Sequence, residues 1–170
     1  MDTSPSHEID VDRLSIRMAT PADQAAIQAL YNESLSEGAI PGNDTGADIE
    51  NLTVGYLAED GESGFWVAEY DGTIIGMVGA LRTAENRAEL RRLRVCDPFR
   101  RKGIGTMLLR EALTFCAHHG YLKVILDVRI EGAPAIAMFE KFGFKHSRTR
   151  NVDGRELLDF YLDLYEDADG

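Results

Sequence analysis

The segment 89–126 constrains the fold most, because it joins two strand patterns through one amphipathic helix. Residues 89–95 have the pattern of a strand, and a turn at Asp97-Pro98-Phe99 follows them. Apolar side chains then recur on one side of a helix, at Ile104, Leu108, Phe115 and Cys116. The run Val124-Ile125-Leu126 is continuously apolar, which is typical of a strand covered on both faces. This order predicts two neighbouring parallel strands in an α/β sheet.

Strand and helix patterns also precede this segment. Residues 14–18 alternate as a strand, and Thr20-Pro21-Ala22-Asp23 supplies the cap residue, proline and acid that begin a helix. The stretch 34–46 has the Gly, Ser, Asn and Asp of a loop, and one short helix is expected after it. Asp71-Gly72 lies between two apolar runs and predicts a two-residue hairpin turn.

The carboxyl-terminal part adds one helix and a second hairpin. Pro134 is placed to begin the helix and Gly143 to end it. Two strands, 145–150 and 157–164, flank a turn at Asp153-Gly154. The complete order is βααβββαβαββ, which predicts a mixed central sheet flanked by helices.

The length of 170 residues suits one domain with a sizeable core. We expect the folded part to span 13–165, between a disordered tail over 1–12 and an acidic tail over 166–170. The amino terminus lacks the pattern of a signal peptide and no run approaches membrane-spanning length, which predicts a cytoplasmic protein. The two cysteines have neither the spacing of a zinc site nor the density of a disulfide scaffold.

The formal net charge of −11 restricts the partners of the chain. Such a surface repels nucleic acid phosphates and anionic membranes, so we expect neither as a partner. An anionic ligand therefore needs a local basic site. The acidic excess also favours a cationic amine substrate, although solubility alone accounts for such a balance.

One local basic site stands where the predicted strand passes into the helix. The sequence Arg100-Arg101-Lys102-Gly103-Ile104-Gly105 ends in the first turn of this helix. There, free backbone N–H groups, the positive end of the helix dipole and glycines without side chains let a pyrophosphate approach the main chain. The three cations can add charge-assisted hydrogen bonds to phosphate oxygens. A solvated basic turn before a glycine-capped helix has the same residue types, so the motif alone leaves both interpretations open.

Two other nucleotide-binding motifs do not fit this spacing. A P-loop requires Gly-Lys-Ser or Gly-Lys-Thr after a longer glycine loop. The dinucleotide fingerprint requires a third glycine where Leu108 stands. Mononucleotide binding is therefore the weaker interpretation.

With these residues the sequence resembles the GCN5-related N-acetyltransferase (GNAT) family. The pyrophosphate motif of that family has Gln or Arg, two residues, Gly, one residue and then Gly or Ala, which Arg100, Gly103 and Gly105 match. The resemblance extends over nearly the whole folded part, from the first strand through Leu93-Arg94-Val95 to the segment 135–144. It implies a GNAT-like acyl-CoA N-acyltransferase fold.

The resemblance also implies acetyl-CoA as co-substrate, no metal, and direct attack of a primary amine on the thioester in a ternary complex. Backbone groups near Leu93 and Val95 would bind the pantetheine arm, and one N–H there would polarise the thioester carbonyl as an oxyanion hole does, while both side chains pack in the core. The residues expected to hold acetyl-CoA are Leu93, Arg94, Val95, Arg100, Arg101, Lys102, Gly103, Ile104, Gly105, Thr106 and Phe139.

Two positions depart from the family pattern. Many members have an asparagine where Gly132 stands, and a tyrosine that protonates the CoA thiolate where Phe139 stands. A phenyl ring has no transferable proton, so this general acid cannot be carried over, and water or another group must supply the proton.

Glu89 is the candidate general base. It begins the strand that leads to Leu93, and family members often have a carboxylate near this place. An exposed ion pair with Arg87, Arg91 or Arg92 explains the residue equally well.

The sequence thus predicts an N-acetyltransferase that acts on a small-molecule or peptide amine. A second hypothesis is a non-catalytic acyl-CoA-binding sensor or regulatory module, motivated by the missing tyrosine and asparagine. A third, nucleic-acid binding through the segment 82–102, is opposed by the acids interleaved in that segment and by the acidic composition. The loops 34–46 and 151–154 are expected to select the acceptor, and exposed sheet edges favour a homodimer.

Overall fold

The structure is a computed structural model of the chain and describes residues 9–36, 44–129 and 133–164. Within these ranges, seven strands form one sheet in the order β1-β2-β3-β4-β5-β7-β6. The strands are β1 Leu14–Met18, β2 Gly64–Tyr70, β3 Thr73–Ala84, β4 Arg87–Val95, β5 Lys123–Arg129, β6 Lys145–Val152 and β7 Arg155–Asp163. The α-helices are α1 Gln24–Ser36, α2 Ala47–Glu50, α3 Leu52–Gly55, α4 Ile104–His118 and α5 Ala133–Lys141.

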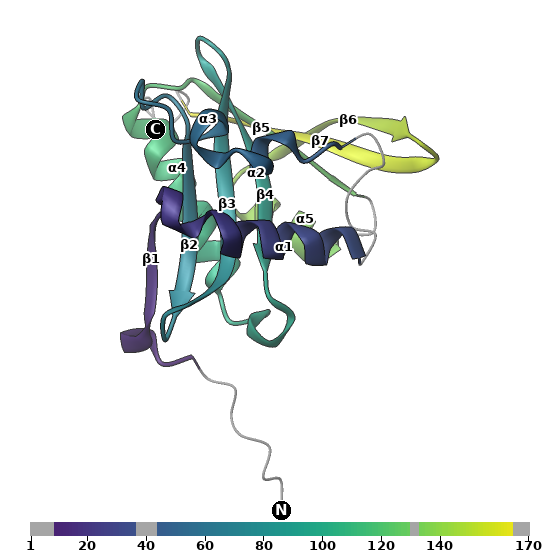
Figure 1. The fold of residues 1–170 in the computed structure, drawn as a ribbon. Helices are drawn as coiled ribbons and strands as arrows, with labels where there is room; N and C mark the ends of the chain where they lie inside the picture. The colour runs from purple at the N-terminus through teal and green to yellow at the C-terminus, as the bar shows by residue number, and fades with distance from the viewer. Residues whose placement is uncertain (1–8, 37–43, 130–132, 165–170) are drawn as a thin grey trace, which may run out of the picture.

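The sheet is mixed, as predicted. Strands β1 to β4 pair antiparallel in chain order, β4 pairs parallel with β5, and β5, β7 and β6 are antiparallel. Helices α1, α2 and α3 lie over one face of the sheet, and α4 lies over the other (Figure 1). Within the described residues, no helix combines the length and the apolar composition that a membrane crossing requires.

Each face of the sheet has its own hydrophobic core. On the face of α1, buried residues include Ile27, Leu30, Ile49, Leu52, Tyr56, Phe65, Val67 and Met77. On the face of α4, they include Val78, Leu90, Ile104, Leu108, Leu109 and Val124. Of the four apolar positions that predicted α4, Ile104, Leu108 and Cys116 are buried in this core, and Phe115 is partly buried against it.

Strand β4 contains a bulge in its second half. Met77 of β3 pairs with Arg94 and Gly79 pairs with Arg91, so β4 has one more residue than β3 over this stretch. Arg92 lies in this stretch and has a left-handed backbone with φ of 62°. An extra residue reverses the alternation of side chains. Leu90 before the bulge and Leu93 after it consequently both pack in the core on the face of α4.

The parallel pair β4–β5 is short. Its register covers only Arg87–Glu89 of β4 against Lys123–Ile125 of β5. Strand β5 instead pairs with β7 along its whole length, from Lys123 to Arg129. Beyond Glu89, the described parts of β4 and β5 therefore no longer pair with each other.

Several elements agree with the sequence predictions and others differ. The two-residue turn at Asp71-Gly72 and the turn at Asp153-Gly154 are both confirmed, and all four residues have left-handed backbones. The single helix expected after the first loop is two short helices, because the Asn51 side chain accepts a hydrogen bond from Val54 N–H and begins α3 anew. Part of that loop, 37–43, lies outside the described residues.

The boundary expected at the amino-terminal tail also differs. A 3₁₀ turn, η1, spans Val11–Arg13, and the Asp10 carboxylate accepts a hydrogen bond from Asp12 N–H at its start. Ile9 packs against the core on the face of α4. The described residues before Arg13 thus belong to the folded part.

We predict that Gly79→Ala destabilises the fold. A Cβ at this position of β3 would lie 2.8 Å from Tyr56 Cε1 and 3.0 Å from Phe65 Cδ2, and both rings are fully buried. Overpacking of this kind lowers the free energy of unfolding by about 1–3 kcal/mol, which urea denaturation followed by circular dichroism would measure. Gly105→Ala is the control, because its nearest contact would be an ordinary 3.7 Å. Equal stability of the two variants would contradict the packing described.

Candidate active site

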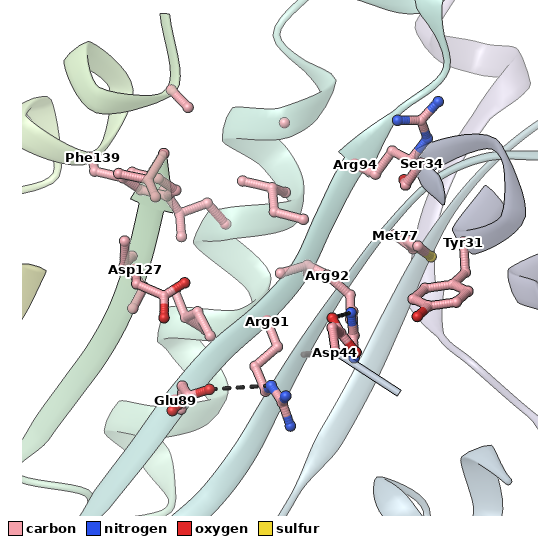
Figure 2. A pocket seen from close by; sticks show the side chains of 18 of the residues that line it. Tyr31, Ser34, Asp44, Met77, Glu89, Arg91, Arg92, Arg94, Asp127 and Phe139 are labelled. Carbon is pink, nitrogen blue, oxygen red and sulfur yellow. Dashed lines mark hydrogen bonds and ion pairs between the residues drawn. The ribbon is translucent and has the colours of Figure 1, made fainter. Parts of the chain in front are cut away.

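A cavity of about 930 Å³ opens where β4 and β5 separate. Strands β4 and β5, the start of α4, helix α5 and the segment that leads into α2 all contribute to its wall (Figure 2). The predicted site residues that line it are Glu89, Leu93, Arg94, Val95, Arg100, Gly105 and Phe139. Residues more than 40 positions apart in the sequence are thus brought to one place.

The other predicted residues lie at or near the start of α4 without lining this cavity. Arg101 and Lys102 line a smaller cavity of about 420 Å³ with Ile9, Val11 and Met107. The Ile104 side chain is buried in the core, so its main chain alone is available to a ligand. Gly103 precedes the helix with φ of 83°, and Thr106 lies in the first turn of the helix.

The first turn of α4 is open to an anion. The first helical hydrogen bond joins Met107 N–H to Gly103 O at 3.1 Å, so the N–H groups of Gly105 and Thr106 precede the helical ladder. A Cβ at Gly105 would have no neighbour closer than Met138 Sδ at 3.7 Å. The main chain here is therefore unobstructed, as close approach of a phosphate requires.

Arg100 closes the loop before α4. Its Nε donates to Val95 O at 2.9 Å, and its Nη1 lies 3.1 Å from Asp97 Oδ1. The side chain is still 43% exposed. This residue joins the end of β4 to the turn before α4 and leaves a partly exposed positive charge in the cavity wall.

Glu89 is the last residue of β4 that pairs with β5, opposite Ile125, where these two strands begin to separate. Burial raises the pKa of its carboxyl, Arg91 lowers it, and the charge of Asp127 adds to the rise, so that the pKa lies above its ordinary value. Its Oε1 lies 3.1 Å from Arg91 Nε. A raised pKa makes a carboxylate a stronger base, and the predicted ion pair is present as well.

Asp127 is a cavity residue that the sequence analysis missed. It lies on β5, and its Oδ2 lies 3.2 Å from Arg150 Nη2. Figure 2 shows Asp127 and Glu89 on neighbouring strands beside the cavity. Its position in the sequence could have identified it, since Asp127 is the polar residue directly after the apolar run Val124-Ile125-Leu126. Ligands of α/β sheets bind at the carboxyl ends of parallel strands, where such a residue is placed.

A buried ionic cluster, which we define as Arg92, Asp44, Asp48, Tyr31 and Tyr56, lies on the face of α1. Arg92 donates to Asp48 through Nε at 3.0 Å and Nη2 at 2.6 Å, and to Asp44 Oδ1 through Nη2 at 2.9 Å. Its guanidinium lies 5.0 Å from the centre of the Tyr31 ring. Tyr56 donates its hydroxyl to Asp48 at 2.6 Å. Figure 2 shows Arg92 and Asp44 together on the side of Tyr31.

The cluster is charged at neutral pH. Burial acts to raise the pKa of Asp44 and of Asp48. The hydrogen bonds and charge of Arg92, together with a hydrogen bond from Gly46 N–H to Asp44 and one from Tyr56 to Asp48, outweigh burial, and both pKa values lie below the ordinary range. Burial acts to lower the pKa of Arg92, and the two carboxylates raise it above its usual value. Of the three arginines expected as alternative partners for Glu89, Arg91 forms the ion pair, whereas Arg92 pairs with Asp44 and Asp48.

Phe139 faces the cavity from α5 and is nearly buried, at 6% exposure. Its ring packs edge-on against Phe144 with centroids 5.8 Å apart. Gly132, the other position that departs from the family pattern, lies outside the described residues.

The mixed sheet, the separation of its parallel pair and the open helix start together define an acyl-CoA N-acyltransferase fold. Comparison with known proteins gives the same class. The sequence profile described as "Acetyltransferase (GNAT) family" matches residues 25–144. The chain therefore belongs to the GNAT acetyltransferase family.

Curated relatives match over part of their length. Human N-acetyltransferase 8 is 41% identical over 103 residues, which are 58% of this chain and 45% of that protein. Human N-acetylaspartate synthetase is 40% identical over 101 residues, which are 59% of this chain and 32% of that protein. The matched region thus spans less than half the length of these relatives.

Solved structures match over nearly the whole chain. A putative acetyltransferase from Salmonella typhimurium, solved with its cofactor acetyl-CoA, has a TM-score of 0.77 at 23% identity and covers 91% of this chain and 95% of its own. A ribosomal-protein-alanine N-acetyltransferase from Brucella melitensis has a TM-score of 0.73 at 26% identity, with coverage of 88% and 99%. These matches confirm the predicted fold.

We predict that Asp48→Asn destabilises the protein at neutral pH more than in acid. The folded-state pKa of Asp48 is lowered, so its contribution to stability is complete above the unfolded pKa of about 3.9 and is lost as the pH falls through the folded value. At pH 7 the loss of hydrogen bonds to a charged partner costs about 1.5–3 kcal/mol. Urea unfolding of wild type and variant at neutral pH and near pH 3 measures this difference, which should shrink in acid.

Asp97→Asn is the matched control for this experiment. Its side chain is 83% exposed, so the variant should differ from wild type by less than about 1 kcal/mol at either pH. A stability difference for Asp48→Asn that is the same at both pH values would contradict the charged cluster.

Proposed function

We propose that this chain is an acetyl-CoA-dependent N-acetyltransferase that acetylates a primary amine in a ternary complex. The observation that carries the proposal is one cavity with an open helix start at Gly105 and a carboxylate of raised pKa at Glu89. Membership of the family supports it, as do the names of the relatives, which describe N-acetylation. The acetyl-CoA in a structural neighbour supports the choice of cofactor.

The residues of the cavity fit acetyl-CoA, which would supply an activated acyl group on a good leaving group. Main-chain N–H groups at Gly105 and Thr106 and the charge of Arg100 would hold the pyrophosphate. Main-chain groups of β4 near Leu93 and Val95 would bind the pantetheine arm, since β5 does not take them as partners. Arg101 and Lys102, at the neighbouring smaller cavity, would add positive charge for the remaining phosphate.

Glu89 would act on the acceptor amine. It takes one proton from the nitrogen, directly or through a water, as the C–N bond forms and the C–S bond breaks. The main-chain N–H in the bulged part of β4 polarises the carbonyl. Because Phe139 has no acidic proton, water protonates the departing sulfur, and the ring contributes packing beside the reacting group.

A non-catalytic acyl-CoA-binding module is the alternative, and the phenyl ring of Phe139 is the observation that favours it. The two functions differ in one measurement, because a sensor binds acetyl-CoA without release of free thiol at any acceptor concentration. The cytoplasmic location and the homodimer stay predictions from the sequence.

We predict that Gly105→Asp abolishes most binding of CoA. A carboxylate in the first turn repels the pyrophosphate and fills the space beside the main chain, and we expect a loss of affinity of about 100-fold or more. Isothermal titration with CoA measures the change. Gly105→Asn has the same size without the charge and should lose less. Wild-type affinity in a folded Gly105→Asp variant would place the phosphates elsewhere.

We predict that Glu89→Gln lowers kcat by about 10²–10⁴-fold and leaves CoA affinity unchanged. In wild type, kcat should rise with pH through the raised pKa of Glu89, and this dependence should vanish in the variant. Stopped-flow or thiol-detection assays across a pH series measure both. Glu85→Gln, in the turn between β3 and β4, is the control and should behave as wild type. An unchanged kcat in Glu89→Gln would remove this residue from the chemistry.

A further inference from the structure

The second half of β4 contains three arginines whose surroundings differ. The side chains of Arg92 and Arg94 are each 8% exposed, and both form ion pairs with carboxylates from the layer of α1 and α2. The Arg91 side chain is 32% exposed and lines the cavity. Arg91 is therefore the arginine of this strand that is most open to a molecule entering the cavity.

Arg91 meets Glu89 through one edge of its guanidinium. The ion pair joins Arg91 Nε to Glu89 Oε1 at 3.1 Å. A guanidinium has five N–H donors, of which Nε has one, and the four on the terminal nitrogens suit the two oxygens of a planar anion. The two residues are two positions apart on β4, before the extra residue of the bulge, so their side chains lie on the same face of the strand.

Opposite charges are thus presented side by side at the place where the amine must react. Glu89 and, across the gap, the 53% exposed Asp127 attract an ammonium group. When an amine occupies Glu89, the pairing of that carboxylate with Arg91 weakens, and a partly buried guanidinium without an anion is unfavourable. An acceptor that has its own carboxylate provides a new anion for the Arg91 guanidinium, whereas a simple amine does not.

We propose that the acceptor is an α-amino acid or a similar amine with an adjacent carboxylate, and that Arg91 binds this carboxylate. The ammonium and carboxylate of such a molecule are attached to one carbon, so the ammonium can pair with Glu89 while the carboxylate pairs with Arg91. The inference rests on the proposed function, because it names the acceptor class of the same site. Arg91 is then a specificity-determining residue.

Matched acceptors test the proposal in wild type. Each set contains an α-amino acid, its amide and the corresponding amine without the carboxyl carbon, for each of the common side chains. Binding is measured as a thermal shift of the protein saturated with CoA, and turnover as release of free CoA from acetyl-CoA. For the best side chain, we expect the acid to have a kcat/KM at least about tenfold above both analogues, since loss of a charge-assisted bidentate contact has this size.

Variants then assign the preference to Arg91. In Arg91→Gln the KM of the acid should rise at least about tenfold while that of the amide stays unchanged, and Arg91→Lys should recover part of the preference because it keeps the charge. Arg87→Gln is the control, because this exposed residue lies at the start of β4 outside the cavity lining and should retain the preference. An equal loss for acid and amide in Arg91→Gln would show that Arg91 only positions Glu89, and would overturn the proposal.

The two readouts separate this inference from the proposed function. Acids that bind to the CoA complex without turnover would support the carboxylate site and contradict the acetyltransferase activity. Amides or simple amines that react as well as the acids would overturn the carboxylate site and leave the activity standing. If no acceptor in any set binds to the CoA complex or reacts, both the carboxylate site and the acetyltransferase activity are contradicted.

Discussion

The pairing of Arg92 with Asp44 and Asp48 is the interaction on which the site depends. A non-glycine residue in the left-handed region costs about 1–2 kcal/mol, and Arg92 adopts this conformation in the middle of a strand with φ of 62°. Its guanidinium is nearly buried between two carboxylates, one of which also accepts the hydroxyl of Tyr56. Partnered in this way, the charge stabilises the bulge and joins β4 to the segment that leads into α2.

The bulge explains how one strand serves both a core and a cavity. Before the bulge, Leu90 packs in the core on the face of α4, and Glu89 and Arg91, which alternate with it along the strand, line the cavity. After it, the reversed alternation returns Leu93 and Val95 to the same core. Strand β5 follows β7 over seven consecutive pairs, from Lys123 to Arg129. Because β4 and β5 are each held by a different antiparallel neighbour, they separate after Glu89, and the cavity forms between them.

Much of this architecture could be predicted from local sequence, and the rest could not for a physical reason. The two hairpin turns, the extent of α4 and the glycines at its start depend on residues close together in the chain, so their patterns are readable. The ionic cluster joins Arg92 to Asp48 and Asp44, which precede it by 44 and 48 residues, and no local sequence period reveals a contact over such a separation. The bulge has a readable signal, because apolar positions at Leu90 and Leu93 are three apart where a regular strand requires two or four.

The distribution of cations resolves how so acidic a chain could hold a polyanion. Seven of its 18 Lys and Arg residues lie in the segment 87–102. In sequence alone this segment resembles a basic patch, yet Arg92 and Arg94 pair with acids of the α1 and α2 layer and are 8% exposed. The charge that stays accessible is divided among Arg87 at the start of β4, Arg91 inside the cavity, and Arg100-Arg101-Lys102 at the start of α4. Such a division does not form the continuous surface that a nucleic acid backbone requires, and it is compatible with the two proposed ligands, CoA with its phosphates at the start of α4 and an acceptor with its carboxylate at Arg91.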